Sequence, residues 1–519
     1  MARSLSSFGF SAPFDDPGED SVDRQTRSAR SPQSFPMRSL SFLLLSCMVP
    51  VLGATSVAPA WESLYRRPNP AWWSDAKFGI FIHWGPYSVP AFSKVGEYAE
   101  WYWRDLIDEK RRSHAEVKAF HDRVYGPGFT YADFVPHFRA ELFDPAQWAE
   151  ILAQSGAKYV VLTSKHHDGF ALWPSAEANR SWGRAWNSVD TGPRRDLLGE
   201  LTAAVRRTGL KMGVYFSLYE WYNPLYVADP KLFVAKHMVP QFKDLVSRYE
   251  PAIIFADGEW EHPAELWKST ELLQWLFTDG PNPDEVVVND RWGKGTRRTH
   301  GGYYTTEYGS GMPTAEHPWE ENRGMGFSFG YSRTENLPDY NSSEELLYML
   351  IDIVARGGNF LLDIGPTADG RIPVIMQQRL LDIGGWIEIN GEAIYGTRPW
   401  LRACQWSKGE VKDAPRGGAK GGYDIMKLTV APDPGFAVKE IFFTQKGGTL
   451  YAICPRLPDD DLVIRDLKLA AGATIDLVGG ARELAWTQNG SDVRISLPRL
   501  NPSATRYPAA WVFRIAGFR

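Results

Sequence analysis

Seven short strand-like runs, most of them apolar and separated by stretches with helical spacing, constrain the fold of residues 61–399 more than any other feature. Runs of this length that are apolar on both faces are typical of strands in a parallel sheet covered by helices. Strands alternating with helices predict a (β/α)8-like barrel, an α/β fold. A doubly wound open sheet is the competing topology, but no glycine-rich phosphate loop follows the first run. The predicted strands are 78–85, 158–164, 211–217, 252–257, 285–291, 303–308 and 359–366, and the predicted helices are 147–155, 196–207, 230–249, 261–277, 343–355 and 374–389.

Past residue 399 the pattern changes to short, closely spaced runs, several of them alternating between apolar and polar residues. Turn residues separate the runs, which predicts a C-terminal antiparallel β-sandwich over 400–519. The glycine-rich stretch 417–422 is predicted to be a surface loop. The runs are 429–430, 440–444, 450–453, 462–464, 473–477, 493–497 and 511–515.

The first 60 residues differ from both regions. Residues 1–36 are rich in Ser, Arg, Pro and Asp, which predicts disorder. From Met37, one positive charge, an apolar segment at 37–54 and small residues up to Ala60 are typical of a signal peptide. We therefore expect a secreted, periplasmic or lysosome-like protein, with an apolar linker as the alternative. No run approaches the roughly 20 apolar residues of a membrane-spanning helix.

Charge and cysteine content exclude some classes of function. With 57 basic and 62 acidic residues, the net charge of −5 provides no electrostatic basis for binding nucleic acid or a membrane surface. Three cysteines do not make a disulfide framework. Cys47 lies in the predicted signal peptide, and pairing of Cys404 with Cys454 stays open, as does assembly into a homo-oligomer.

Polar side chains stand at or just past the C-terminal ends of the predicted strands. The most prominent is Asp257, which ends an apolar run immediately before Gly258. In a barrel these strand ends share one face, so we expect the side chains to converge on one pocket. For Asp257 alone, a role at the start of the helix 261–277 is the alternative. The other members of the group are His83, His166, His167, Tyr215, Asn289, Arg291 and Glu307.

Asp257 and Glu307 supply the two carboxylates that glycoside cleavage requires. In a retaining enzyme one attacks the anomeric carbon and the other protonates the leaving oxygen, with the carboxyl groups about 5–5.5 Å apart. The protonated partner needs a pKa raised by burial or by the other carboxylate. The histidines and Arg291 are suited to binding sugar hydroxyls, whereas Trp101 and Phe329 are suited to forming apolar walls.

A metal site at His166, His167 and Asp168 is the competing interpretation. Adjacent side chains on an extended segment are expected to diverge, and the sequence contains no HExxH motif or cysteine cluster. A serine-esterase triad lacks its GxSxG elbow. The residues therefore favour glycoside cleavage over both alternatives.

Several stretches of the barrel region together resemble the α-L-fucosidase family of retaining glycoside hydrolases. The resemblance implies a barrel followed by a β-sandwich, with no metal or organic cofactor. It also implies that Asp257 is the nucleophile of an aromatic-x-Asp motif, in which this chain has Phe255 where the family often has Trp. The matching stretches are 72–85, 97–102, 163–169, 186–188, 255–260, 289–293 and 357–365.

The same resemblance implies roles for the remaining site residues. Glu307 is similar to the family's acid/base, with Glu316 and Glu320 in a nearby loop as alternatives, and Glu259 is expected to be a buried structural or helix-start residue. Phe329 resembles the aromatic residue that faces the C5 methyl group. The positions similar to the family's fucose contacts are His83, Glu100, Trp101, His166, His167, Tyr215 and Arg291.

We therefore expect an exo-α-L-fucosidase that removes terminal fucose, with retention, from fucosylated oligosaccharides or glycoconjugates. A different retaining exoglycosidase is the near alternative. A non-catalytic carbohydrate-binding protein is the alternative from another class, and the presence of both Asp257 and Glu307 argues against it.

Overall fold

A computed structural model describes residues 60–411, 423–458, 460–497, 507 and 509–519. The predicted disorder of 1–36, the predicted signal peptide at 37–54 and the predicted loop at 417–422 lie outside these residues. Among the residues described, no helix is both long and apolar enough to cross a bilayer.

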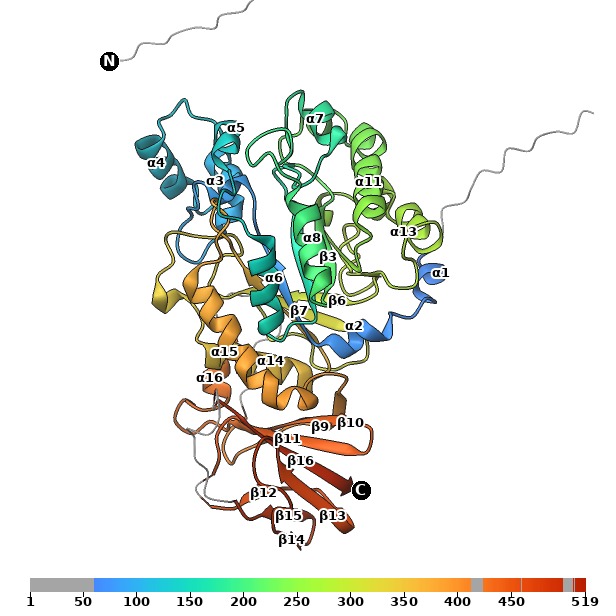
Figure 1. Cartoon of the computed structure of the whole chain (residues 1–519), viewed down its shortest axis with the longest axis vertical. Helices are drawn as coiled ribbons and strands as arrows, with labels where there is room; N and C mark the ends of the chain where they lie inside the picture. The colour runs from blue at the N-terminus through green and yellow to red at the C-terminus, as the bar shows by residue number, and fades with distance from the viewer. Residues whose placement is uncertain (1–59, 412–422, 459, 498–506, 508) are drawn as a thin grey trace, which may run out of the picture. The chain divides into compact units, whose positions relative to one another are not determined.

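Eight parallel strands form the centre of the N-terminal part, in the order β5-β4-β3-β2-β1-β8-β7-β6. Figure 1 labels β3, β6 and β7 of this sheet, with helices such as α6 and α8 beside them. The backbone N–H groups of Gly302 and Tyr303 donate to the carbonyl of Val288, so hydrogen bonds also link β5 to the residues just before β6. This arrangement confirms the predicted barrel class. The strands are β1 (Phe78–Ile82), β2 (Tyr159–Lys165), β3 (Lys211–Ser217), β4 (Ile253–Asp257), β5 (Val287–Val288), β6 (Tyr304–Glu307), β7 (Trp319–Gly324) and β8 (Asn359–Ile364).

Helices follow most of these strands and supply the apolar layer around them. The predicted helices at 147–155, 196–207, 343–355 and 374–389 are confirmed as α6 (Pro145–Gln154), α8 (Leu197–Arg207), α14 (Ser343–Ala355) and α15 (Val374–Asn390). Further helices, which were not predicted, are α1 (Trp61–Tyr65), α2 (Ala71–Ala76), α3 (Tyr102–Ile107), α4 (His114–Val124), α5 (Tyr131–Phe134), α7 (Ala176–Trp182) and α9 (Pro224–Ala228).

Two predicted helices are interrupted. The range 230–249 contains α10 (Pro230–Phe233), a π-helical turn (Val234–Met238) and α11 (Val239–Tyr249). Pro240 in the first turn of α11 has no N–H to donate, so regular α-helical bonding cannot continue through it. The range 261–277 contains α12 (Ala264–Trp267) and α13 (Ser269–Thr278), which are separated by Lys268 in a left-handed conformation.

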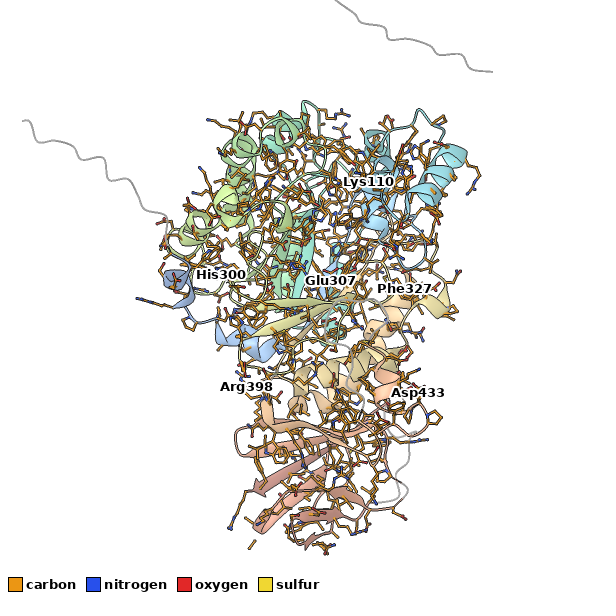
Figure 2. All side chains as sticks on the ribbon, turned by 180° about the vertical axis from the view of Figure 1, so that it is seen from behind. Lys110, His300, Glu307, Phe327, Arg398 and Asp433 are labelled. Carbon is orange, nitrogen blue, oxygen red and sulfur yellow. The ribbon has the colours of Figure 1, made fainter. Side chains whose placement is uncertain are left out.

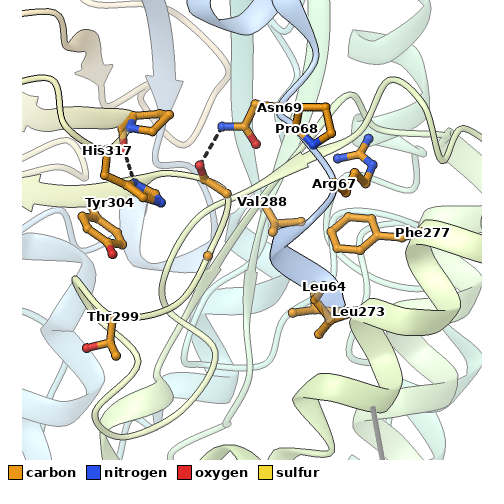
Figure 3. A pocket seen from close by; sticks show the side chains of 13 residues that line it. Leu64, Arg67, Pro68, Asn69, Leu273, Phe277, Val288, Thr299, Tyr304 and His317 are labelled. Atoms are coloured by element: carbon orange, nitrogen blue, oxygen red, sulfur yellow. Dashed lines mark hydrogen bonds between the residues drawn. The ribbon is translucent and has the colours of Figure 1, made fainter. Parts of the chain in front are cut away.

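Between β5 and β6, and between β6 and β7, the chain contains no helix. A cavity of about 390 Å³ lies beside this gap, lined by Leu64, Val288 and Tyr304 among others (Figure 3). The Asn69 side chain closes part of it by donating to the carbonyl of Gly302. None of the predicted site residues lines this cavity.

The strand β7 was not predicted. Its sequence is almost entirely polar, yet all six residues are buried. Several of these polar groups form hydrogen bonds inside the barrel, where Tyr159 donates to Glu320 and the Asn322 amide donates to the carbonyl of Thr306. The prediction that Glu320 lies in a loop is therefore wrong. Apolar periodicity cannot reveal a strand whose partners are polar side chains from distant strands.

Past the barrel, two antiparallel sheets enclose one apolar core. The larger has the order β13-β16-β11-β10-β9 and the smaller the order β12-β15-β14. These sheets confirm the predicted β-sandwich, although β9 and β14 were not predicted. The strands are β9 (Arg398–Trp406), β10 (Lys439–Lys446), β11 (Thr449–Cys454), β12 (Leu462–Ile464), β13 (Leu469–Leu477), β14 (Trp486–Asn489), β15 (Asp492–Ile495) and β16 (Trp511–Phe518).

The predicted strand at 429–430 is wrong, because these residues follow the short helix α16 (Ile425–Leu428). Thr429 is the C-cap of that helix, and its hydroxyl donates to the carbonyl of Ile425. The β-propensity of two β-branched residues is too weak to outweigh this local hydrogen bond. The division of the chain at residue 399 stays a proposal.

The geometry of the larger sheet excludes a disulfide between Cys404 and Cys454. Cys404 lies on β9 and Cys454 on β11, with β10 between them. Two strand spacings separate such residues by about 10 Å, beyond the span that a disulfide can bridge.

A buried charge cluster joins the barrel to the larger sheet. Asp352 on α14 accepts hydrogen bonds at 2.6 Å from Lys439 of β10, from Arg356 and from the hydroxyl of Tyr423. Burial alone would raise the pKa of Asp352, but the charges of Arg356 and Lys439 lower it well below its usual range. The cluster therefore holds an ionised carboxylate in the interior.

We expect Asp352→Asn to lower the free energy of unfolding by about 3–5 kcal/mol, because two buried cations lose their counter-charge. Because the folded-state pKa of Asp352 is depressed, its stabilisation is present above the unfolded-state pKa and is lost as the pH falls toward the folded-state value. Denaturant unfolding at several pH values measures both effects. The exposed pair of Asp433 with Lys427 is the control, and Asp433→Asn should change stability by less than about 1 kcal/mol. Equal effects of the two variants would contradict this assignment.

Candidate active site

The predicted site residues meet at the C-terminal ends of the barrel strands. His83 directly follows β1, and His166 and His167 directly follow β2. Tyr215 lies within β3, Asp257 is the last residue of β4 and Glu307 the last of β6. Arg291 follows β5, which is shorter than the predicted strand 285–291. The expected convergence on one face is therefore present in the fold.

Asp257 is the most heavily coordinated acid of this group. Its Oδ1 accepts a 2.8 Å hydrogen bond from Nη1 of Arg291, and its Oδ2 accepts one of 2.8 Å from the hydroxyl of Tyr215. His167 Nε2 lies 3.4 Å from Oδ2. Burial alone would raise the pKa of Asp257, but Arg291, His167 and Arg297 together hold it well below its usual range. The site therefore contains a carboxylate that stays ionised and oriented near neutral pH.

Arg291 joins the two predicted carboxylates. Its Nη1 donates to Asp257, and its Nη2 donates to Oε2 of Glu307 at 3.1 Å. Its Nε donates to the hydroxyl of Thr305, and the guanidinium lies over the ring of Phe255. One planar guanidinium that contacts both acids limits their separation to a short span. Asp257 and Glu307 thus lie close together.

Glu307 is the more accessible of the two acids. Its side chain is 28% exposed, against 10% for Asp257. Its Oε1 accepts a 2.8 Å hydrogen bond from the hydroxyl of Tyr98. Figure 2 labels Glu307 on the barrel, well apart in this view from Arg398 and Asp433 of the C-terminal region. Asp257 is therefore the more buried acid, and Glu307 lies nearer to solvent.

The three histidines surround Asp257 as neutral rings. Burial lowers the pKa of His83 to about 3, and burial also lowers the pKa values of His166 and His167 well below the usual range. Nδ1 of His83 lies 2.6 Å from Oδ1 of Asp363, and Nδ1 of His167 lies 2.7 Å from the hydroxyl of Ser217. Neutral imidazoles fixed in this way can donate or accept hydrogen bonds toward a ligand.

The expected divergence of His166 and His167 is wrong. Their ring centroids are 4.2 Å apart. The strand β2 has already ended at Lys165, and the N–H of Gly169 donates to the carbonyl of His166. The chain therefore turns here, which removes the alternation that an extended segment would impose. Among the described residues, no group of three or more His, Cys, Asp or Glu side chains is placed to hold a metal ion.

Aromatic rings pack against the histidines of the site. Phe329 stacks on His83 with ring centroids 4.8 Å apart. Trp101 packs against His167, Trp221 and Trp260. Glu100 is buried and accepts a 2.8 Å hydrogen bond from the N–H of Gly330, which holds the segment that carries Phe329. Trp101, Phe329 and Glu100 thus adjoin the predicted site.

The sequence did not indicate four residues that contact the acids or histidines of the site: Tyr98, Asp363, Ser217 and Arg297. Tyr98 and Asp363 lie inside the stretches 97–102 and 357–365 that resemble the family. The sequence did not indicate their hydrogen-bond partners. Arg297 lies outside the matching stretches and outside the predicted strands, so no motif indicated it. Its Nη2 lies 3.6 Å from Oδ1 of Asp257, and its Nε contacts Glu259.

The alternative acids occupy different places. Glu320 lies early in β7, paired with Thr305 and Asn359, and burial raises its pKa to about 8. It therefore lies inside the barrel, within hydrogen-bond reach of Tyr159 rather than of Asp257. Glu316 is exposed in the connection between β6 and β7. Glu259 is buried against Arg297, and burial raises its pKa.

Two carboxylates on the strand ends of a parallel barrel, bridged by a guanidinium and enclosed by neutral imidazoles and aromatic rings, define a glycoside hydrolase. A family model described as α-L-fucosidase matches residues 46–392, and one described as the α-L-fucosidase C-terminal domain matches residues 436–516. The chain belongs to the α-L-fucosidase family.

Individual relatives agree with this assignment. The chain is 41% identical to the human tissue α-L-fucosidase, over 89% of this chain and 92% of that protein. It is 46% identical to an α-L-fucosidase of Dictyostelium discoideum, over 70% of this chain and 79% of that protein. Among solved structures, the α-fucosidase of Thermotoga maritima in complex with a mechanism-based inhibitor superposes with a TM-score of 0.71 at 34% identity, covering 88% of this chain and 99% of that one.

Proposed function

We propose that this protein is an exo-α-L-fucosidase that removes terminal α-L-fucose from oligosaccharides or glycoconjugates by a two-step retaining mechanism. The observation that carries the proposal is the single guanidinium of Arg291, which donates to both Asp257 and Glu307. Two acids on opposite sides of one guanidinium match the close pair that retaining cleavage requires. The family and the relatives support fucose as the sugar.

In the first step Asp257 attacks the anomeric carbon of fucose, and the bond from that carbon to the leaving oxygen breaks. Glu307 gives its proton to this oxygen, so the aglycone departs as a neutral alcohol and fucose remains as an ester of Asp257. In the second step Glu307 takes a proton from water as the water oxygen attacks the same carbon. Asp257 leaves as a carboxylate, and two inversions give net retention.

Burial and exposure support this division of roles. Asp257 is buried and kept ionised, as a nucleophile must be, and Tyr215 and Arg291 fix its two oxygens. Glu307 is partly exposed, which allows exchange of protons with water between turnovers. Substrate binding would displace Arg291 from at least one acid, because Asp257 must bond to the sugar and Glu307 must transfer a proton during the reaction.

The remaining predicted residues would bind the sugar. We assign hydrogen bonding of the fucose hydroxyls to His83, His166, His167, Tyr215 and Arg291, and apolar contact to the two aromatic walls. Nδ1 of His166 is buried without a hydrogen-bond partner among the described residues, as expected for a group that a ligand hydroxyl satisfies. Phe329 would face the C5 methyl group and Trp101 the opposite wall, while Glu100 adds a further polar contact.

The cellular setting is also a proposal. A signal peptide starting near Met37 would deliver the enzyme to a secreted, periplasmic or lysosome-like compartment, where its substrate is a fucosylated oligosaccharide or glycoconjugate. The charge pattern makes nucleic acid an unsuitable partner. Assembly into a homo-oligomer remains compatible with these assignments.

Hydrolysis of an aryl α-L-fucoside, followed by proton NMR from the first seconds, tests the proposal. We expect release of the phenol and initial formation of α-L-fucose before mutarotation. A carbohydrate-binding protein would release no phenol, and an inverting enzyme would release β-L-fucose first. Faster turnover of a different aryl glycoside would show that the preferred substrate contains another sugar. A chelator should leave the rate unchanged, whereas a metal-dependent hydrolase would lose activity.

A further inference from the structure

The segment between Asp290 and Glu307 is basic. It contains Arg291, Lys294, Arg297 and Arg298 and no acidic residue, although the chain as a whole has a net charge of −5. Arg291 is buried between the two carboxylates and is 4% exposed. The side chain of Arg297 is 40% exposed, so this cation is both beside Asp257 and open to solvent.

Arg297 is fixed from one side only. Its Nε contacts Glu259, which is buried, and its guanidinium lies near the ring of Trp260. Its Nη2 lies 3.6 Å from Oδ1 of Asp257, too far for a hydrogen bond. The structure gives its Nη1 no hydrogen bond with any residue that it describes. Nε and Nη2 form the edge that is turned toward Glu259 and Asp257, which leaves Nη1 available to a bound group.

The position of the Arg297 guanidinium follows from the oxygen of Asp257 that it approaches, which is Oδ1. Oδ1 of Asp257 is also the oxygen that accepts from Arg291, and Arg291 leads on to Glu307. Tyr215 and His167 lie instead at Oδ2. Arg297 is therefore on the flank of Asp257 that faces Glu307, where the leaving oxygen is protonated under the proposed function. A group bound by Arg297 belongs to the sugar next to fucose.

We propose that Arg297, anchored by Glu259, is a specificity-determining residue that receives an anionic group, a sulfate ester or a carboxylate, on the sugar unit next to the fucose. A guanidinium fork matches both anions, and a hydrogen bond to a charged group is stronger than one to a neutral hydroxyl. Lys294 and Arg298 are exposed on the same segment, but neither forms an ion pair with Asp257. This inference rests on the proposed function.

The test compares kcat/KM for three fucosyl disaccharides: one with an unmodified second sugar, one with a sulfated sugar and one with a uronic acid. For each variant, the readout is the ratio of kcat/KM on an anionic substrate to that on the neutral one. Any effect of the substitution on Asp257 itself cancels in this ratio. The sulfated and carboxylated substrates show which anion the site prefers.

We expect the wild-type enzyme to prefer an anionic substrate, and Arg297→Met to lower the ratio about tenfold, as for loss of a charged hydrogen bond. Arg297→Lys keeps the charge but loses the fork, so its ratio should fall by less. The matched control is Arg298→Met, which removes the same charge from the neighbouring exposed position and should leave the ratio within about twofold.

An unchanged ratio in Arg297→Met would overturn the proposal, and so would an equal loss in Arg298→Met, because that result indicates general charge attraction. Absence of any anionic preference in the wild-type enzyme would overturn it as well. If Arg297→Met does not fold, the ratio of Arg297→Lys is compared with that of Arg298→Met. A lower ratio in Arg297→Lys supports the proposal, and equal ratios overturn it. Turnover of an uncharged aryl α-L-fucoside by the wild-type enzyme tests the proposed function separately, so the two failures are distinguishable.

Discussion

Asp257→Ala is expected to lower kcat/KM on an aryl α-L-fucoside by about 10⁴-fold or more, the scale on which enzymes lose activity when their nucleophile is removed. The variant loses the atom that bonds to the anomeric carbon, and Arg291 is left with one acid in place of two. Steady-state kinetics with the same substrate for both proteins measure the loss.

Azide separates a chemical role from a structural one. In the space left by the Asp257 side chain, azide attacks the anomeric carbon directly, so turnover rises and the product is a fucosyl azide of inverted configuration. Asp433→Ala, at an exposed acid of the C-terminal region, should retain full activity. Near-normal turnover by Asp257→Ala, or an azide product of retained configuration, would remove Asp257 from the role of nucleophile.

Glu307→Ala should show a loss that depends on the leaving group. With a fucosylated oligosaccharide, whose alcohol must be protonated as it departs, we expect kcat/KM to fall by about 10²–10⁴-fold, the typical contribution of a general acid. With a dinitrophenyl leaving group, which needs no proton, the first step should stay close to that of the wild-type enzyme. A plot of rate against the pKa of the leaving phenol measures this difference.

Azide again identifies the role. It should accelerate turnover of Glu307→Ala on the activated substrate and give a fucosyl azide of retained configuration, because it attacks the ester of Asp257 in place of water. Glu316→Gln is the matched control, since Glu316 is exposed nearby and was the sequence-based alternative. If Glu316→Gln reproduces the loss and Glu307→Ala does not, the acid/base assignment moves to Glu316.

The polar strand β7 could not be predicted from a local pattern of apolar residues. Most of the seven predicted barrel strands were visible because they bury apolar side chains, and burial leaves a pattern within the segment itself. In β7, Glu320 and Glu321 are buried beside hydroxyl groups of Tyr159 and Thr306, which lie far away in the sequence. The segment by itself resembles a solvated loop, so Glu320 was misplaced as a possible acid/base.

The sequence by itself determined the α/β barrel, the following β-sandwich and the gathering of polar residues at the strand ends. These features depend on runs of about four to eight residues, whose propensity and apolar pattern are local. It also determined the family, through motifs that the comparisons confirm. Asp257 and Glu307 could be predicted as a pair because parallel strands end on a common face.

Only the tertiary structure decided how these residues are connected. It places one guanidinium, that of Arg291, against both acids, brings Tyr98 to Glu307, and sets Arg297 beside Asp257. Each contact joins residues from different loops, and its geometry depends on how the barrel closes and where each loop packs. No pattern within one segment contains that information, because a hydrogen bond between distant residues forms only when the whole chain has folded.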